Sequence, residues 1–238
     1  AGRPPAPCRY RGGGGPREVM AASGLTLYGH PAFRTFRNVW MLEELGVPYE
    51  LVPVNPRAGE ARKSAFRRLN PHGKIPCLQD GAFVLSESAA INTYLGDKFG
   101  RLVPEPGTQR RALYDQWCFF LMSELDSQSL YIHRKHVDLA AVYGEAPHAV
   151  ETAKAYFLKH AGVAEKQLEE QRGRGEGPFL LGEFTAADIL MVHILRWADQ
   201  IGWLPSGSGT LRAYLQEVTD RPACRRTIAL AEKGTAKL

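Results

Sequence analysis

The chain has 238 residues, of which 44% are hydrophobic, enough to bury a sizeable core in one or two domains. This composition excludes a wholly disordered chain, and its apolar runs are too short and interrupted to match the roughly 20 residues of a membrane-spanning helix. The net charge is +5, but residues 1–19 hold four arginines against one glutamate, so three of the five charges lie there. The remaining excess of two is weak support for a nucleic acid partner.

Residues 1–23 are predicted to form a disordered extension. Nine of the first nineteen residues are glycine or proline, and little in this segment could pack against a core. It also lacks the apolar stretch of a secretory signal.

The four cysteines predict a reducing compartment, which we take to be the cytoplasm. Cys8, Cys77, Cys118 and Cys224 are scattered and form no C-x-x-C pair. This spacing disfavours a disulfide framework and a zinc site. His133 and His136 are three residues apart on a predicted helix, but without an obvious third ligand they favour no metal site.

Residues 24–100 are expected to form a small α/β domain with a four-stranded sheet, because short apolar runs alternate with helical periodicity. In chain order we expect a strand at 25–28, a helix at 35–45, a strand at 49–54, a short helix at 62–69, a hairpin at 75–85 that turns at Asp80-Gly81, and a helix at 87–99.

A linker rich in glycine and proline, residues 101–108, precedes an all-α bundle over residues 109–238. Aromatic and aliphatic residues recur there at intervals of three and four, as in Tyr114, Trp117, Leu121 and Leu125. The sequence "TAAD", Thr185 to Asp188, has the pattern of a capping box at the start of an apolar helix, although the usual acid at its last position is glutamate.

The hairpin and the helix after it contain the candidate binding residues. A proline after Ile75 confines the start of that strand to an edge or a bulge, where the Ile75 backbone can pair with an extended peptide. A cis bond at this proline would mark a tight turn. The alternative is an ordinary turn proline.

Ser86, Glu87 and Ser88 follow at the mouth of the next helix, where free N–H groups favour an anion. There the Ser88 hydroxyl suits a carboxylate and the Glu87 carboxylate suits an ammonium group. The alternative is an N-cap serine followed by an acid in the first turn, which requires no ligand. With Lys74 nearby for a second carboxylate, these residues together favour a short peptide that carries two carboxylates.

The motifs "NPHGKIP", "LSESAAINTYL" and "GEFTAADI", together with the linker, resemble the cytosolic glutathione transferase family over residues 25 to about 230. The resemblance implies a thioredoxin-like domain followed by an α-helical domain, with bacterial-type or theta-like members as the expected class. It also implies that glutathione is the cosubstrate, with no metal. Ile75 would pair with its cysteinyl backbone, Glu87 and Ser88 would hold the γ-glutamyl group, Lys74 would meet the glycyl end, and Pro76 would be cis.

Several residues are candidates for activating the glutathione thiol. An ungapped alignment with the family's motif puts Ala32 at the usual serine position, and alanine has no hydroxyl to donate. The remaining candidates are the N–H groups at the start of the first helix and the side chains of Tyr28, Arg34 and Thr35. Each has a structural alternative, as a core aromatic residue, a surface charge and an N-cap respectively.

Two functions follow from the resemblance. The first is a homodimeric enzyme that conjugates glutathione to small apolar electrophiles, with peroxide or disulfide reduction as a further activity. The second is a glutathione-binding protein with little turnover, which the missing serine permits. The acceptor site is expected between the domains, near Phe33 and the first bundle helix, whose aromatic or soft residues are Tyr114, Trp117, Phe120 and Met122.

Overall fold

The computed structural model describes residues 9–10 and 24–235, so most of the predicted N-terminal extension lies outside the described residues. The chain divides into two compact units. The first contains the residues up to Arg101 and those from Arg221 onward, and the second runs from Leu102 to Asp220.

The first unit is built on a mixed sheet with the order β1-β3-β2-β4-β5. Its strands are β1 (Arg9–Tyr10), β2 (Leu25–Tyr28), β3 (Glu50–Val52), β4 (Cys77–Asp80) and β5 (Phe83–Ser86). β2 and β3 are parallel, whereas β4 is antiparallel to both β2 and β5. The β4–β5 hairpin turns at Gly81, whose positive φ of 60° fits the predicted Asp80-Gly81 turn.

The predicted four-stranded sheet is incomplete, because β1 adds a fifth strand. Arg9 and Tyr10 pair in parallel with Glu50 and Leu51 of β3. Without them β3 would be an edge strand with unpaired backbone groups, which readily accept another segment. A two-residue strand in a segment rich in glycine and proline has no periodicity by which the sequence could predict it.

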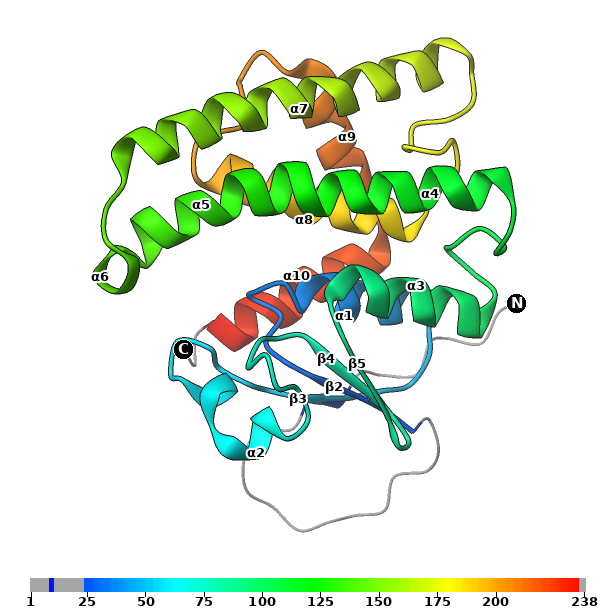
Figure 1. Ribbon diagram of the computed structural model, residues 1–238. Coiled ribbons are helices and arrows are strands. Elements are labelled where there is room, and N and C mark those ends of the chain that lie inside the picture. The colour runs from blue at the N-terminus through cyan, green and yellow to red at the C-terminus, as the bar shows by residue number, and fades with distance from the viewer. Residues whose placement is uncertain (1–8, 11–23, 236–238) are drawn as a thin grey trace. The chain divides into compact units, whose positions relative to one another are not determined.

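Helices cover both faces of this sheet. They are α1 (Phe36–Leu45), the 3₁₀ turn Glu60–Arg62, α2 (Ser64–Arg67), α3 (Ser88–Phe99) and α10 (Pro222–Thr235). Figure 1 shows α1, α3 and α10 on one side of the sheet and α2 on the other. Leu25 and Leu27 of β2 are buried, and the residues that alternate with them, Thr26 and Tyr28, are partly exposed.

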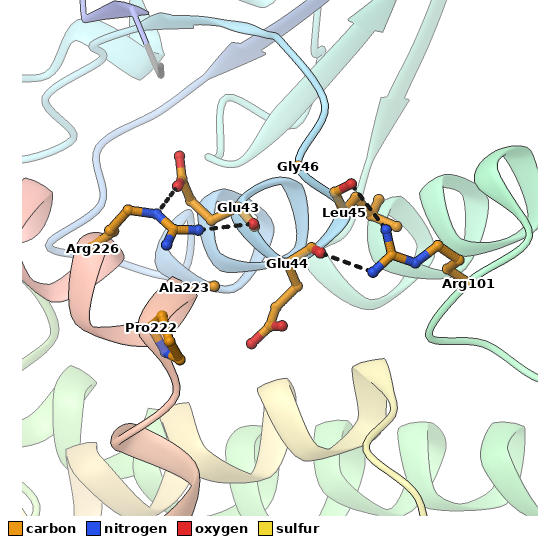
Figure 2. A pocket seen from close by; sticks show the side chains of 8 residues that line it. All are labelled: Glu43, Glu44, Leu45, Gly46, Arg101, Pro222, Ala223 and Arg226. Carbon is orange, nitrogen blue, oxygen red and sulfur yellow. Dashed lines mark hydrogen bonds and ion pairs between the residues drawn. The ribbon is translucent and has the colours of Figure 1, made fainter. Parts of the chain in front are cut away.

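α10 belongs with the first unit, although the sequence analysis places it in the helical domain. Arg221 forms two hydrogen bonds with the Glu44 carboxylate, at 2.7 and 2.8 Å. Figure 2 shows Arg226, which binds the carboxylate and backbone carbonyl of Glu43. These arginines lie at the C-terminal end of α1, where the helix dipole favours cations. Charge pairing between residues almost 180 positions apart leaves no local pattern in the sequence.

The second unit is entirely helical over its long elements, as predicted. It contains α4 (Gln109–Phe120), the π-helical segment Leu121–Leu130, α5 (Tyr131–His133), a second π-helical segment (Arg134–Asp138), α6 (Ala140–Tyr143), α7 (Pro147–Gly173), α8 (Ala186–Gln200) and α9 (Gly209–Thr219). The residues at the predicted spacing on α4 and the segment after it are buried: Tyr114, Trp117, Leu121 and Leu125. The same period continues on α7, where Val150 is partly exposed and the others are buried: Ala153, Phe157, Ala164 and Leu168.

The capping box at the start of α8 is confirmed. Asp188 Oδ2 accepts hydrogen bonds from the Thr185 N–H at 2.8 Å and from the Thr185 hydroxyl at 3.1 Å. Its other oxygen accepts from the Leu180 N–H and the Tyr214 hydroxyl. Burial raises the pKa of Asp188, and the four donors oppose that rise. No helix in the described part of the chain is long and apolar enough to cross a membrane.

Candidate glutathione site

The loop before β4 presents a free stretch of backbone. The Ile75-Pro76 peptide bond is cis, as the resemblance predicts. β4 begins only at Cys77, and within the described residues neither the N–H nor the C=O of Ile75 has a hydrogen-bond partner. Ile75 therefore has one donor and one acceptor available for an extended peptide.

Two contacts fix the course of this loop. The Asn70 side chain donates to the Lys74 carbonyl at 2.7 Å, and the Gly73 N–H donates to the Asn70 carbonyl at 2.9 Å. Gly73 has a φ of 62°, and a Cβ there would lie 3.0 Å from the Ala61 carbonyl oxygen. The backbone before Ile75 is therefore held in one path, while the Lys74 side chain remains exposed.

The N-terminus of α3 has unused donors. The first hydrogen bond of this helix runs from the Ile91 N–H to the Glu87 carbonyl. In the part of the chain that the structure describes, the N–H groups of Ser88, Ala89 and Ala90 have no acceptor. Such N–H groups, at the positive end of a helix dipole, favour an anion.

Glu87 precedes this helix in a backbone conformation that is rare for its residue type. Its φ is 72° and its ψ 115°, and its side chain is exposed. A glutamate with positive φ is strained, and such strain is concentrated at functional sites. α3 thus begins one residue later than predicted, with Glu87 as its N-cap.

The hairpin brings these two features together. Cys77 pairs with Ser86 across β4 and β5. The free backbone of Ile75, two residues before Cys77, and the start of α3, two residues after Ser86, therefore lie at the same end of the hairpin. This is the juxtaposition of a backbone edge and an anion site that the sequence analysis expects.

Ser88 belongs to a buried polar network that the sequence analysis missed. The Ser88 hydroxyl oxygen accepts a hydrogen bond from Arg37 Nη1 at 3.1 Å, and the Ser88 carbonyl accepts from Asn38 Nδ2 at 2.9 Å. Asn38 Nδ2 also donates to Asn92 Oδ1 at 2.7 Å. Arg37, Asn38 and Asn92 are each 0% exposed. The signal was available, because these polar residues occupy the buried faces of α1 and α3, and Asn92 follows Ser88 by one helical turn.

The turn that leads into α1 presents Ala32 at the surface. Ala32 is exposed, and its N–H donates to Nδ1 of the buried His30 at 3.1 Å. The Phe33 N–H donates to the His30 carbonyl at 3.0 Å. Two backbone donors of this turn are therefore already used within the protein.

Tyr28 does not present a free hydroxyl. Its OH donates to Gln79 Oε1 at 2.9 Å, and its ring packs edge-on against Phe66 of α2. Gln79 Nε2 in turn donates to the Gly81 carbonyl, which fixes the orientation of the amide. Burial, with a smaller effect of Glu50 and Cys77, raises the pKa of Tyr28. Because a hydroxyl has one proton to donate, this geometry disfavours thiol activation by Tyr28.

Thr35 and Arg34 differ in accessibility. Thr35 is 0% exposed, and its hydroxyl lies against Gly29, where a Cβ would be 2.2 Å from Thr35 Oγ1. This hydroxyl makes no cap hydrogen bond and has no partner within the described residues. Arg34 is partly exposed. Of the three candidate side chains, Arg34 has a charged group and access to solvent.

The candidate acceptor residues on α4 divide between the core and the surface, as expected. Tyr114 is 0% exposed and lies in the core of the second unit. Trp117 and Phe120 line a hollow of about 290 Å³ with Val163 of α7, and Met122 is partly exposed. Tyr114 therefore leaves the set of acceptor candidates.

A second hollow, of about 400 Å³, lies at the C-terminal end of α1 (Figure 2). Its charged side chains are already used. Glu43 and Glu44 pair with arginines of α10, and Arg101 donates to the carbonyls of Glu44 and Leu45. This hollow thus stabilises the end of α1 and offers no free reactive group of its own. No group of three or more potential metal ligands occurs among the residues described.

Comparisons with known proteins agree with this geometry. Residues 23–97 match the family described as "Glutathione S-transferase, N-terminal domain". Glutathione S-transferase F6 of Arabidopsis thaliana is 40% identical over 218 residues, which are 87% of this chain and 100% of the relative. Glutathione S-transferase 3 of Zea mays is 30% identical over 86% of this chain and 93% of its own length. The chain belongs to the glutathione S-transferase family.

A solved structure supports the same fold. The glutathione transferase URE2P6 of Phanerochaete chrysosporium, in complex with oxidized glutathione, superposes with a TM-score of 0.75 at 27% identity, over 88% of this chain and 97% of that chain. These relatives are plant and fungal proteins, and they give no specific support to the expected theta-like class. The chain is therefore a glutathione transferase.

Proposed function

We propose that this glutathione transferase binds glutathione along the backbone of Ile75 and conjugates its thiolate to small apolar electrophiles. The cysteinyl backbone of glutathione would pair with the N–H and C=O of Ile75. The carboxylate of the γ-glutamyl group would accept from the Ser88 hydroxyl and the N–H groups at the start of α3, while Glu87 would hold its ammonium group. Lys74 would meet the glycyl carboxylate.

This assignment rests on one observation: two sets of unpaired backbone groups in the described residues lie at the same end of the β4–β5 hairpin. Judged among the described residues, Ile75 supplies an unpaired donor and acceptor, and α3 supplies three unpaired donors at the positive end of its dipole. Glutathione offers the complementary groups, a peptide backbone and an α-amino acid carboxylate. The positive φ of Glu87 adds a strained residue beside both edges.

Arg34 is the side chain that we assign to thiol activation. A thiol has a pKa of about 8.5, and only its thiolate attacks an electrophile. Ala32 has no hydroxyl, the Tyr28 hydroxyl donates to Gln79, and the Thr35 hydroxyl is buried. A guanidinium near the sulfur favours the charged form, and the dipole of α1 acts in the same direction. The thiolate sulfur then bonds to carbon as the leaving group departs with the bonding electrons.

Ala32 also favours a second function, glutathione binding with little turnover. The ultraviolet absorbance of the bound thiolate as a function of pH separates the two functions. A bound-thiol pKa well below 8.5 supports catalysis, and a pKa near 8.5 supports binding alone. The three cysteines in the described part of the chain, Cys77, Cys118 and Cys224, form no disulfide. This state suits the cytoplasm, where we place the protein, and we expect it to form a homodimer there.

Calorimetry on Ser88→Ala tests the site. Loss of a charge-assisted hydrogen bond, roughly 1.5 to 3 kcal/mol, should weaken glutathione binding about tenfold or more. Ser127→Ala, at an exposed serine of the second unit, is the matched control and should leave the affinity unchanged. Unchanged affinity in a folded Ser88→Ala protein would rule out this clamp.

A further inference from the structure

Arg37 is the feature that the proposed function leaves unexplained. It is 0% exposed on α1, and taking a guanidinium out of water is unfavourable unless specific partners compensate for it. Its Nη1 donates to the hydroxyl oxygen of Ser88. The cation therefore lies directly behind a residue to which we assign a ligand contact.

This bond determines what the Ser88 hydroxyl can do. A serine hydroxyl has one proton to donate and accepts through its oxygen. Because the oxygen accepts from Arg37, the proton is left for another acceptor, and no group among the described residues takes it. A charged donor also polarises the hydroxyl, so that the bond which the hydroxyl donates becomes stronger.

The electrostatics of this location favour an anion. A buried guanidinium carries its positive charge to the N-terminus of α3, where the helix dipole is already positive and the first turn contains no acidic residue. A carboxylate that accepts from Ser88 and the α3 N–H groups would be attracted by both the guanidinium and the dipole.

We propose that Arg37 is a positioning residue for glutathione, which acts through the Ser88 hydroxyl to strengthen its bond to the γ-glutamyl carboxylate. This inference rests on the proposed function. Arg37 touches neither the ligand nor the sulfur, so it should affect the affinity for glutathione and leave the chemical step unchanged. Lysine at this position would keep the charge but lose the planar fork of the guanidinium.

The test is a double-mutant cycle that measures glutathione binding by calorimetry. Arg37→Gln should weaken binding about tenfold, Ser88→Ala should do likewise, and the double variant should bind no more weakly than Ser88→Ala alone. The Michaelis constant for glutathione should rise in Arg37→Gln, with the turnover number at saturation within about twofold of the unmodified protein. Additive losses in the cycle would overturn the proposal.

Asn92→Ala is the matched control for the network. It removes the bond with Asn38 and a longer bond, at 3.4 Å, to the Arg37 backbone carbonyl, but retains the side-chain pair formed by Arg37 and Ser88. It should lower stability and leave glutathione affinity within about twofold. If Asn92→Ala weakens binding as much as Arg37→Gln, rigidity of the network explains both effects and Arg37 has no role of its own.

A glutathione analogue with a carboxamide in place of the γ-glutamyl α-carboxylate gives a second readout. The penalty of Arg37→Gln should disappear with this analogue, because the bond it supports is absent. Arg37→Lys, which keeps the charge, serves if Arg37→Gln does not fold, and should show a smaller penalty that also disappears. An equal penalty for both ligands would overturn the proposal. Failure of the unmodified protein to bind glutathione would overturn the proposed function as well, which distinguishes the two failures.

Discussion

At the scale of single residues, Ala32 raises the question of how the glutathione thiolate is stabilised. It is exposed at the turn before α1, where a serine-type enzyme would present a hydroxyl, and its N–H is engaged by His30. The protein therefore has to stabilise a thiolate without a serine hydroxyl at this position. Arg34 and the dipole of α1 remain as sources of positive potential.

Restoring the missing hydroxyl should increase activity. Ala32→Ser adds a donor at an exposed position that requires no repacking, and a hydrogen bond to the thiolate favours the charged form. We expect the pKa of bound glutathione to fall by about one unit and turnover with an aromatic electrophile to rise. Ala32→Val, which adds bulk without a donor, is the control and should not lower that pKa. An unchanged pKa in Ala32→Ser would place the sulfur elsewhere.

Substitutions at the three candidate side chains should have unequal effects. Tyr28→Phe should leave the bound-thiol pKa unchanged, because the hydroxyl is donated to Gln79. Thr35→Ala should raise it by less than about one unit, whereas Arg34→Ala should raise it most. The pKa is read from the ultraviolet absorbance of the thiolate. A collapse of turnover in Tyr28→Phe alone would indicate a tyrosine-type enzyme and contradict the role of Arg34.

The buried cysteines should be unreactive. Burial raises the pKa of Cys77 to about 11 and that of Cys118 to about 12. At pH 8 only about one in a thousand Cys77 side chains is then a thiolate, and the thiolate fraction of Cys118 is smaller still. In a Cys8→Ser protein, labelling of both with a thiol reagent should be slow until the protein unfolds. Rapid labelling of Cys77 in the native state would contradict this burial.

The same shifts set the sign of a pH effect on stability. The folded state favours the neutral thiols of Cys77 and Cys118. Their contribution to the free energy of unfolding is therefore complete below pH 9.0, the ordinary cysteine pKa, and is lost as the pH rises from there toward 11 and 12. The Cys118→Ala protein should therefore lose less stability over this range than the unmodified protein.

At the scale of elements, the sequence predicted what depends on local patterns. The hairpin turn at Gly81, the buried stripe on α4 and α7, and the capping box of Thr185 and Asp188 all follow from spacing or turn chemistry. Pairing over long separations was missed, as with β1 on β3 and α10 on α1. The same reason explains why Ser88 was identified whereas its buried partner Arg37 was not.

The capping box should control the stability of the second unit. Asp188 accepts four hydrogen bonds, from Leu180, Tyr214 and twice from Thr185. Asp188→Ala leaves these buried donors without an acceptor and should lower the free energy of unfolding by about 3 kcal/mol or more. Tyr214→Phe removes one bond and should cost about 1 kcal/mol. Urea denaturation measures both, and equal losses would show that the network does not act as described.

The contact between α10 and α1 should stabilise the first unit. Glu44, with a side chain 10% exposed, accepts from Arg221 and from Trp40 Nε1. Glu44→Ala should therefore lower the free energy of unfolding by about 2 kcal/mol. Glu170→Ala, which breaks exposed pairs with Lys166 and Arg174, is the control and should cost less than about 1 kcal/mol. A similar cost for both would mean that α10 contributes little.

At the scale of the whole molecule, the proposed glutathione site depends on both ends of the chain. The residues before Arg101 supply the site, and those after Arg221 complete the same compact unit, with the helical unit inserted between them in sequence. Removal of residues after Arg221 should therefore weaken glutathione binding through loss of folding, although the proposed ligand contacts all precede Arg101.

We expect the chain to assemble into a homodimer through its helical unit. The chain exposes large apolar side chains on its helical unit, among them Phe119 on α4, which is 76% exposed, and Val163 on α7, which is 50% exposed. We expect these side chains to lie at an interface between two copies, because most soluble oligomers are two-fold symmetric homo-oligomers. Light scattering at micromolar concentration should give about twice the 26.4 kDa of one chain.

Phe119→Asp should shift the mass toward the monomer, because a charge at a self-complementary interface is buried twice. Val142→Asp, at a residue 69% exposed on α6, is the matched control and should leave the dimer intact. A monomeric mass for the unmodified protein would contradict the prediction, and a dimer that survives Phe119→Asp would place the interface elsewhere.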